Sequence, residues 1–260
     1  MPIPEYSMTC VCPTIAAALN VPVPSGATGE PIAETLADLA GSGRIAVLAP
    51  DALGLSSLRH FANDMPFLSA LCANRMVALR AVMPSITPVN FATMITGTDL
   101  AGHNVRSKDM GFSCETLFDV LGANGLSAAG CGRPGYTGGE LLARCAQHKG
   151  VARVPDDAGT EEVTLRIARE SLPEFIITQI GGTDDHFHRF GPASDSARPK
   201  VQETDQRLQR LCGELGALGY AIIILADHGQ HETGDPSHMG SHGTDSDEDC
   251  LVPCTWIAAH

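Results

Sequence analysis

The sequence predicts an α/β fold in which helices sandwich a mostly parallel central sheet. Short apolar runs alternate with helical patterns along the chain, as they do in strand–helix–strand units. Two of the runs, residues 45–49 (IAVLA) and 221–225 (AIIIL), are continuously apolar, as in parallel strands buried on both faces. The 260 residues are 43% hydrophobic and 18% charged, with no repeat or linker. We therefore expect a single domain over residues 1–260.

Each predicted element has its own pattern. Residues 32–40 have helical spacing, with Pro31 expected in the first turn. Residues 201–218 form a second amphipathic helix directly before the strand at 221–225. Three weaker apolar runs, 76–82, 127–131 and 175–180, are predicted to be further strands.

The end of the chain has a different pattern. After Ala226, a polar loop of more than twenty residues leads to LVPCTWIA at 251–258 without a helical pattern. A parallel neighbour requires a crossover, so we expect this last strand to be antiparallel to its predecessor. Loops of this length inside compact domains usually carry function.

Charge and cysteine usage limit the function classes. Seventeen basic and 30 acidic side chains give a net charge of −13, which argues against binding to a nucleic acid polymer or an anionic membrane. No stretch of eighteen apolar residues exists, and we identify no signal peptide at the N-terminus. Nine scattered cysteines without a CxxC pair fit reduced thiols. We therefore expect a cytoplasmic protein.

Carboxylates and imidazoles follow the predicted strands. Asp51, Asp184 and the Asp227–His228 pair each come just after a strand, and the final loop adds His231, His238 and His242. The carboxyl ends of parallel strands meet at one sheet edge, where α/β proteins bind ligands. Asp and His are ligands for zinc or manganese, and two such ions about 3.5–4 Å apart clamp a phosphoryl group.

The same residues also have structural interpretations. Asp51 would serve as a helix N-cap for the apolar pattern that follows it, and His186, His231 and His238 fit solvent-facing or supporting positions. The spacing of four between Asp184 and His188 matches one helical turn, so both would face one ion. Because caps do not explain all these residues at strand ends, we favour a metal site.

Five motifs occur in the order found in a known superfamily. They are PDAL at 50–53, MPSITPVNFATMITGT at 83–98, DDHFHRFGP at 184–192, ADHGQH at 226–231 and GSHGTDSDEDCLVP at 240–253. Together they resemble the alkaline phosphatase superfamily, in particular its nucleotide pyrophosphatase/phosphodiesterase-like and phosphonoacetate hydrolase-like branch. The resemblance covers about residues 44–258. It implies an alkaline phosphatase-like core, here without a cap domain.

The resemblance also implies roles for individual residues. Thr87 would be the nucleophile, and Asn90 in the same stretch and Lys108 are taken as further catalytic residues. One metal would be held by Asp51, Thr87, Asp227 and His228, and the other by Asp184, His188 and His242. Lys108 stands where diesterase relatives often place an asparagine. A lysine there suits a dianionic monoester or phosphonate, although a solvated surface lysine is the alternative.

Several alternatives remain open at this stage. Thr87 would otherwise be a helix N-cap, and Ser85 is its nearest rival as nucleophile. Phe187 replaces the glycine usual before the ligand histidine, so Asp185 is an alternative to Asp184. Ala52 likewise replaces a common glycine. Sulfatase chemistry is disfavoured because no Cys/Ser-x-Pro-x-Arg motif is present.

The predicted function is hydrolysis of a phosphoric ester by two divalent metals through a Thr87 phospho-enzyme. Zinc is preferred, and manganese is the alternative. A phosphonate C–P hydrolase and a phosphomonoesterase are alternative activities, and a non-catalytic metal-binding relative ranks lower. The substrate would be a small phosphorylated or phosphonate compound. Phe112, Arg133 and Tyr136 are candidates for contacting its variable part, each with packing or surface exposure as the alternative.

Overall fold

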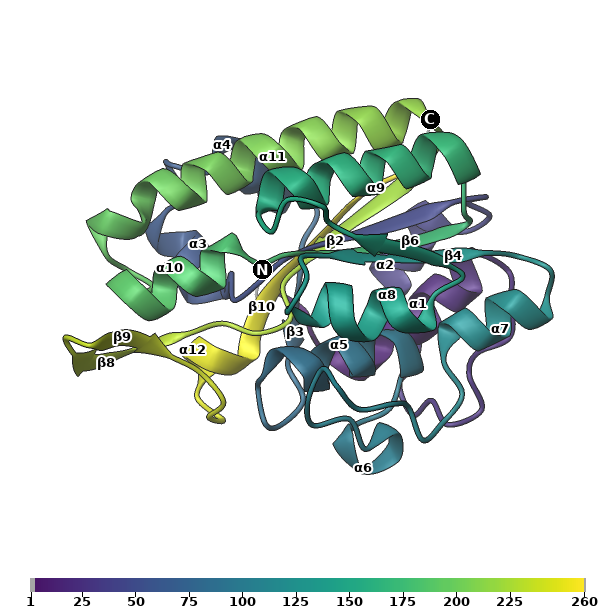
Figure 1. The fold of residues 1–260 in the computed structure, drawn as a ribbon, viewed down its shortest axis with the longest axis horizontal. Coiled ribbons are helices and arrows are strands. Elements are labelled where there is room, and N and C mark those ends of the chain that lie inside the picture. The colour runs from purple at the N-terminus through teal and green to yellow at the C-terminus, as the bar shows by residue number, and fades with distance from the viewer. Residues whose placement is uncertain (1–2, 260) are drawn as a thin grey trace.

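A computed structural model describes residues 3–259, and a central eight-stranded sheet dominates it (Figure 1). The strands lie in the order β1-β3-β10-β7-β2-β6-β4-β5, and β8 and β9 form a separate two-stranded hairpin. The strands are β1 (Glu5–Ser7), β2 (Ile45–Pro50), β3 (Val77–Arg80), β4 (Ala128–Gly132), β5 (His148–Val151), β6 (Phe175–Ile180), β7 (Ala221–Leu225), β8 (His231–Asp235), β9 (His238–Ser241) and β10 (Leu251–Ile257).

The sheet is parallel apart from one strand. Strand β10 is antiparallel to both neighbours, pairing Val252 with Leu79 of β3 and Thr255 with Ile224 of β7. The predicted fold class and the antiparallel last strand are therefore confirmed. All five apolar runs predicted as strands lie in this sheet, as β2, β3, β4, β6 and β7.

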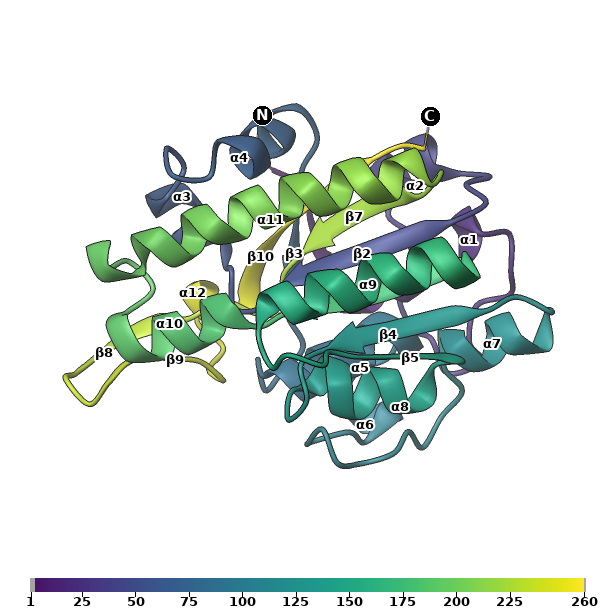
Figure 2. The same ribbon diagram turned by 45° about the horizontal axis from the view of Figure 1, so that its top comes forward.

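Helices cover both faces of the sheet (Figures 1 and 2). The two long helices α9 and α11 pack on one face, where α4 joins α11, and α1, α5 and α7 lie on the other. The helices are α1 (Val11–Ala18), α2 (Ala33–Leu39), α3 (Leu55–His60), α4 (Pro66–Asn74), α5 (Thr87–Thr96), α6 (Leu100–His103), α7 (Leu117–Ala123), α8 (Ala143–Cys145), α9 (Asp157–Ser171), α10 (Gly182–Phe190), α11 (Arg198–Ala217) and α12 (Asp247–Cys250).

Burial of the central strands explains their composition. Every residue of β2, β6 and β7 is buried, because helices cover both faces. Such strands need apolar side chains on both sides, which gives continuous rather than alternating apolar runs. A polar residue in one of them, Gln179 in β6, therefore requires a hydrogen-bonding partner.

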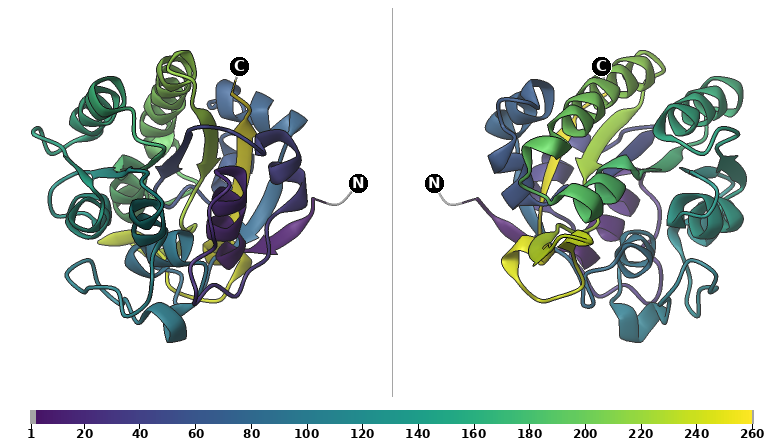
Figure 3. Two further views of the ribbon diagram at one scale, coloured as in Figure 1. Left: turned by 90° about the vertical axis from the view of Figure 1, so that its right-hand side faces the viewer. Right: turned by 60° about the vertical axis from the view of Figure 1, so that its left-hand side comes forward.

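The structure differs from the prediction in four places. Helix α2 begins after Ile32, so Pro31 precedes the helix rather than occupying its first turn. Strands β1 and β5 were not predicted, since they are short and mostly exposed or half-buried and so carry no apolar run. The long polar segment after Ala226 is not one loop, because it contains the β8–β9 hairpin and helix α12. This hairpin lies beside α10 (Figure 3).

Among the described helices, none combines the length and the apolar character needed to cross a membrane.

Candidate metal and nucleophile site

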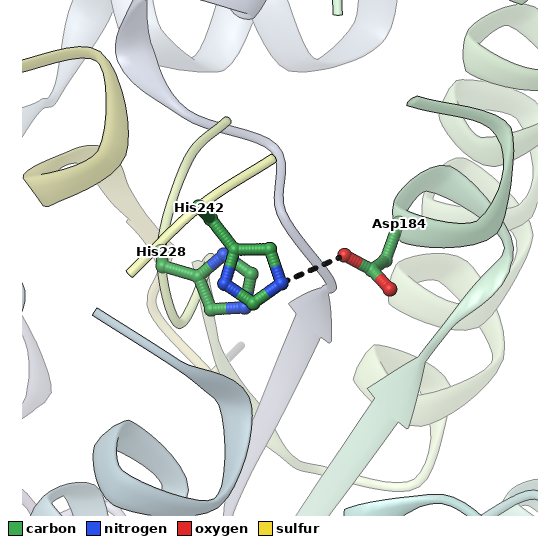
Figure 4. Close-up of side chains that lie close together, drawn as sticks. All are labelled: Asp184, His228 and His242. Carbon is green, nitrogen blue, oxygen red and sulfur yellow. Dashed lines mark ion pairs between the residues drawn. The ribbon is translucent and has the colours of Figure 1, made fainter. Parts of the chain in front are cut away.

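The residues predicted to bind metal gather at the carboxyl edge of the sheet. Asp51 directly follows β2, Asp184 lies in the first turn of α10 after β6, and Asp227 and His228 follow β7. His242 follows β9, the second strand of the hairpin. Figure 4 shows the side chains of Asp184, His228 and His242 together beyond the tips of the strands. Elements far apart in the sequence therefore supply a single site.

One group of donors consists of Asp51, Asp227, His228 and Thr87. His228 Nε2 lies 3.6 Å from Asp51 Oδ1 and 3.3 Å from Asp227 Oδ2. The hydroxyl of Thr87 lies 3.1 Å from the same nitrogen. One ligand atom from each of Asp51, Asp227 and His228 lies within 4.8 Å of the others. This is the residue set that the resemblance assigns to the first metal.

A second group surrounds Asp184. Its Oδ1 atom lies 3.3 Å from His188 Nε2 and 3.7 Å from His242 Nε2 (Figure 4 marks the latter pair). His228 borders this group as well as the first, because its ring stacks on that of His242 with centroids 3.9 Å apart. The two groups are therefore adjacent, as a two-metal site requires.

Backbone carbonyls fix the orientation of all three histidines. The Nδ1 atoms of His188, His228 and His242 lie 2.8, 3.0 and 3.0 Å from the carbonyl oxygens of Gly240, Gly229 and Ser85. A carbonyl only accepts, so each Nδ1 carries the proton and donates it. The Nε2 atoms point at the carboxylates, and whenever a ring is neutral its Nε2 carries the lone pair that can bind a metal.

The carboxylates are held where they repel one another. Burial, followed by the nearby Asp227 and Asp184, raises the pKa of Asp51 well above its usual value. Burial also raises the pKa of Asp227, although His228 acts against it. For Asp184, burial is outweighed by the hydrogen bond with His188 and by the neighbouring His228, which lower its pKa. The groups around Asp51 and Asp227 therefore do not fully stabilise the charges of these two carboxylates.

Two orphaned oxygen atoms fit a metal ion. Asp51 Oδ1 and Asp227 Oδ2 are buried and accept no hydrogen bond. The other oxygens of these side chains are engaged, Asp51 Oδ2 by the Gln179 amide and Asp227 Oδ1 by the Ala52 N–H. An unsatisfied buried carboxylate oxygen is costly. A divalent cation between the two would satisfy both, and the Asp/His donors suit zinc or manganese.

Thr87 is not a helix N-cap, and it lines a pocket beside the carboxylates. It is the first residue of α5, whose N-cap is Ile86. With Asp51 and Asp184 it lines a pocket of about 250 Å³. Its rival Ser85 is fully buried and donates its hydroxyl to the Thr244 carbonyl at 2.6 Å. Asp51 is no cap either, because α3 begins only at Leu55 with Gly54 as its N-cap.

Asn90 and Lys108 have contrasting environments. Asn90 is fully buried, and its amide accepts the Val82 N–H at 2.7 Å and donates to the Val82 and Ile86 carbonyls. It holds the segment before Thr87, and it is not among the residues lining the pocket. Lys108 does line the pocket. Its loop is held by Arg144, which donates to the carbonyls of residues 108–110.

The geometry separates Asp184 from Asp185. Asp184 faces His188 and His242, whereas Asp185 accepts hydrogen bonds from Tyr136 at 2.6 Å and from Arg133 at 2.9 Å. Phe187 in the position of the usual glycine is buried and stacks on Phe61 of the segment after α3. It thereby anchors α10. Ala52, in place of the other common glycine, adopts a left-handed φ of 61°.

Sequence reasoning missed several residues around the site. Gln179 hydrogen-bonds Asp51, and Gln230 donates to Asp184 Oδ1 at 2.6 Å. Arg106 lines the pocket together with Lys108. His231, which was expected at a solvent-facing or supporting position, pairs with Asp249 at 2.8 Å, and Asp249 also accepts hydrogen bonds from Thr244 in the loop after His242. A polar side chain inside an otherwise apolar predicted strand was an available signal for Gln179 only.

Comparison with known proteins finds similarity to phosphodiesterases. A family model described as type I phosphodiesterase / nucleotide pyrophosphatase matches residues 45–112 and 145–248. Venom phosphodiesterase 2 of Crotalus adamanteus is 25% identical over 211 residues, which cover 67% of this chain and 25% of the venom protein. The chain thus spans about a quarter of the length of that relative.

Two solved structures share the fold. Phosphonoacetate hydrolase from Sinorhizobium meliloti, in complex with phosphonoacetate, is 18% identical with a TM-score of 0.58, and the match covers 75% of this chain and 58% of that one. Human ectonucleotide pyrophosphatase / phosphodiesterase 5 is 12% identical with a TM-score of 0.64, covering 83% and 88% of the two chains. The resemblance to the alkaline phosphatase superfamily is therefore confirmed at the level of family and fold.

Proposed function

Because the chain belongs to the type I phosphodiesterase and nucleotide pyrophosphatase family, we propose that it is a metal-dependent hydrolase of phosphoric esters with Thr87 as its nucleophile. The observation that carries the proposal is the position of the Thr87 hydroxyl. It lies at a helix start, in a pocket, and 3.1 Å from an imidazole nitrogen that belongs to both groups of candidate metal ligands. A threonine that served only the fold would not need to lie in a pocket beside a histidine of the candidate metal site.

Two metal positions follow from the donor groups. Asp51, Thr87, Asp227 and His228 would hold one ion, and Asp184, His188 and His242 the other, with zinc preferred over manganese. Bound ions would lower the pKa of the Thr87 hydroxyl and offset charge on the phosphoryl oxygens. The supporting residues Gln179, Gln230 and Asn90 are positioning residues in this scheme, since they contact donors or backbone.

The reaction then has two displacements at phosphorus. The Thr87 oxygen attacks in line, a P–O bond to the threonine forms, and the P–O bond to the leaving alcohol breaks as that oxygen takes up a proton. Water then attacks the phosphothreonine, releasing phosphate or a phosphomonoester and restoring the hydroxyl. Lys108, whose side chain lines the pocket, would contact the phosphoryl oxygens.

A second activity is favoured by one observation. Arg106 and Lys108 line the pocket of a chain whose net charge is −13. Two cations suit a substrate with more negative charge than a simple diester, such as a phosphomonoester or a phosphonate. Hydrolysis of bis(p-nitrophenyl) phosphate, p-nitrophenyl phosphate and phosphonoacetate, compared in parallel, would rank the three activities.

The proposal also includes the cellular compartment of the protein and the size of its substrate. The nine cysteines are free thiols, which supports a reducing compartment such as the cytoplasm. The pocket of about 250 Å³ supports a small phosphorylated or phosphonate substrate.

Replacement of Thr87 tests the proposal. Thr87→Ala removes the nucleophile but leaves the carboxylate and imidazole donors, so we expect turnover to fall by about 10³-fold or more while bound zinc is retained. Thr87→Ser is the matched control, since its hydroxyl should support partial activity. Turnover rates and elemental analysis of the same preparations supply both readouts. Undiminished hydrolysis by Thr87→Ala would exclude the covalent route.

A further inference from the structure

A buried charge network supports one wall of the pocket. Tyr136 lines the same pocket as Thr87 and Asp184. Its phenol donates a hydrogen bond to Asp185 Oδ1 at 2.6 Å, and its ring lies over the Arg133 guanidinium, 3.8 Å from Cζ to the ring centroid. Arg133 Nη2 in turn donates to Asp185 Oδ2 at 2.9 Å. The three side chains therefore form a closed set of contacts.

The base of this network is buried. The Arg133 side chain is 9% exposed, and its Nε lies 3.7 Å from Oδ1 of Asp157, whose side chain is 3% exposed. Asp157 Oδ1 also accepts the Gly182 N–H at 3.2 Å. A Cβ on Gly181 would collide with Arg133 and lie 3.1 Å from the Tyr136 ring. The guanidinium and the ring thus pack directly on the backbone between β6 and α10.

These contacts determine which part of Tyr136 is left for a ligand. The hydroxyl is used by Asp185, and one face of the ring is covered by Arg133. Burial and the Asp185 bond raise the pKa of Tyr136, so the phenol keeps the proton that it donates. With the hydroxyl and one face of the ring engaged in this way, the carbon surface of the ring is the part of Tyr136 left for a ligand in the pocket. Such a surface packs against an aromatic or other apolar group, and it offers no hydrogen bond.

The other two specificity candidates are placed differently. Phe112 packs against the hydrophobic core, and Arg133 lies beneath the ring rather than in the pocket lining. Among residues 3–259, the pocket lining otherwise consists of polar, charged or small residues together with Pro88. Tyr136 is therefore the aromatic surface available there.

We propose that Tyr136 is a specificity residue whose ring contacts the organic group of the substrate, and that Asp185 and Arg133 are its positioning residues. The preferred substrates would carry an aromatic group rather than a short alkyl group next to the phosphorus. This inference rests on the proposed function, since it assumes that the phosphoryl group binds beside Thr87.

Binding of two phosphonates to the zinc-loaded protein tests the proposal without turnover. Phenylphosphonate and methylphosphonate present the same phosphonate group and differ in the group that the ring would contact. By titration calorimetry we expect phenylphosphonate to bind about tenfold more tightly to the wild type. Tyr136→Ala should reduce that ratio to about one, because the ring that distinguishes the two ligands is removed.

Further variants distinguish the ring that contacts the ligand from the side chains that position the ring. Tyr136→Phe keeps the ring and should retain most of the preference. Asp185→Asn and Arg133→Lys should weaken phenylphosphonate binding by about two- to fivefold, because the ring loses its support. Tyr6→Phe is the matched control, since it also removes a phenol that donates to a carboxylate at 2.6 Å, in this case to Glu34. It should change neither affinity.

The outcomes distinguish the two proposals. A wild-type ratio near one, or a ratio that survives in Tyr136→Ala, overturns the role of Tyr136 and leaves the hydrolase proposal intact. Failure of both phosphonates to bind, together with absence of ester hydrolysis, removes the proposed function and this inference with it.

Discussion

His103 is a fully buried imidazole with both ring nitrogens in hydrogen bonds. Its Nδ1 accepts the Val105 N–H at 3.0 Å, so the proton of the neutral ring lies on Nε2, 3.2 Å from the Thr93 hydroxyl. Protonation would break the bond to Val105. Burial accordingly lowers the pKa of His103 to about 4. The residue joins α6 to α5, just before the loop that carries Arg106 and Lys108.

The lowered pKa predicts how stability depends on pH. Between the unfolded pKa of about 6.5 and the folded value of about 4, the unfolded chain binds a proton that the folded chain does not. Above pH 6.5 the neutral His103 makes its full contribution to the free energy of unfolding. As the pH falls toward 4, that free energy decreases by up to about 3 kcal/mol. Denaturant unfolding of wild type and His103→Gln at several pH values measures it. The free energy of unfolding of His103→Gln should fall less steeply with decreasing pH than that of the wild type. Equal slopes for the two proteins would contradict the role assigned to His103.

Single residues also show what the sequence can predict about the site. Asp51, Asp184, Asp227, His228 and His242 were identifiable because each is a metal-binding residue type at a strand end or in a known motif. Gln179 was not identified, and Asp185 was considered only as an alternative to Asp184, because their roles depend on partners more than 40 residues away in the chain. Likewise, Asn90 resembles an active-site residue in sequence, yet its hydrogen bonds go to the backbone.

The β8–β9 hairpin is an element that the sequence pattern did not predict. All residues of β8 except the half-buried His231 are exposed, so no apolar alternation marks the strand. The central strands were predictable for the opposite reason, since complete burial requires continuous apolar runs. The hairpin is nevertheless fixed against α10 at Gly240, where a Cβ would collide with the Phe187 carbonyl. This contact brings the Gly240 carbonyl to His188.

Gly240→Ala should therefore disturb the second metal position. The added methyl would push the hairpin away from α10, weakening the carbonyl contact that orients His188 and displacing nearby His242. We expect loss of about 1–3 kcal/mol of stability and an approximately tenfold weaker zinc affinity at that position. Zinc titration and thermal unfolding provide the readouts.

The matched control is Gly213→Ala on α11. Nothing lies within 4 Å of a Cβ at this exposed helical position. The substitution should leave zinc affinity unchanged and raise stability by about 0.5–1 kcal/mol through helix propensity. Equal effects of the two glycine substitutions on zinc affinity would show that the contact with α10 does not matter.

At the scale of the whole molecule, the candidate site joins segments that are far apart in the sequence. Its donors come from the ends of β2, β6 and β7 in the central sheet and from the segment after the largely exposed hairpin. Bound metal would cross-link the hairpin to the sheet. It would also stabilise the charge on Asp51, whose pKa is raised by burial and then by the nearby Asp227 and Asp184.

Removal of metal should therefore lower stability, and unevenly over the molecule. At free zinc about 1,000 times the dissociation constant, binding adds about 4 kcal/mol, which corresponds to a fall in Tm of the order of 10 °C on chelation. Hydrogen exchange should accelerate most in residues 231–242 and least in the buried strands β2 and β6. An unchanged Tm after chelation would argue against tightly bound metal.

The antiparallel strand β10 has a further consequence for how this chain tolerates change in length. Because β10 runs against β7, the segment from Leu225 to Leu251 leaves and re-enters the sheet on the same side. Extra residues at the exposed tip between β8 and β9 would not alter any strand pairing in the central sheet. Doubling a flexible loop costs only about 0.6 kcal/mol in closure entropy. This tip is therefore a suitable place to insert a peptide epitope or a fluorescent reporter.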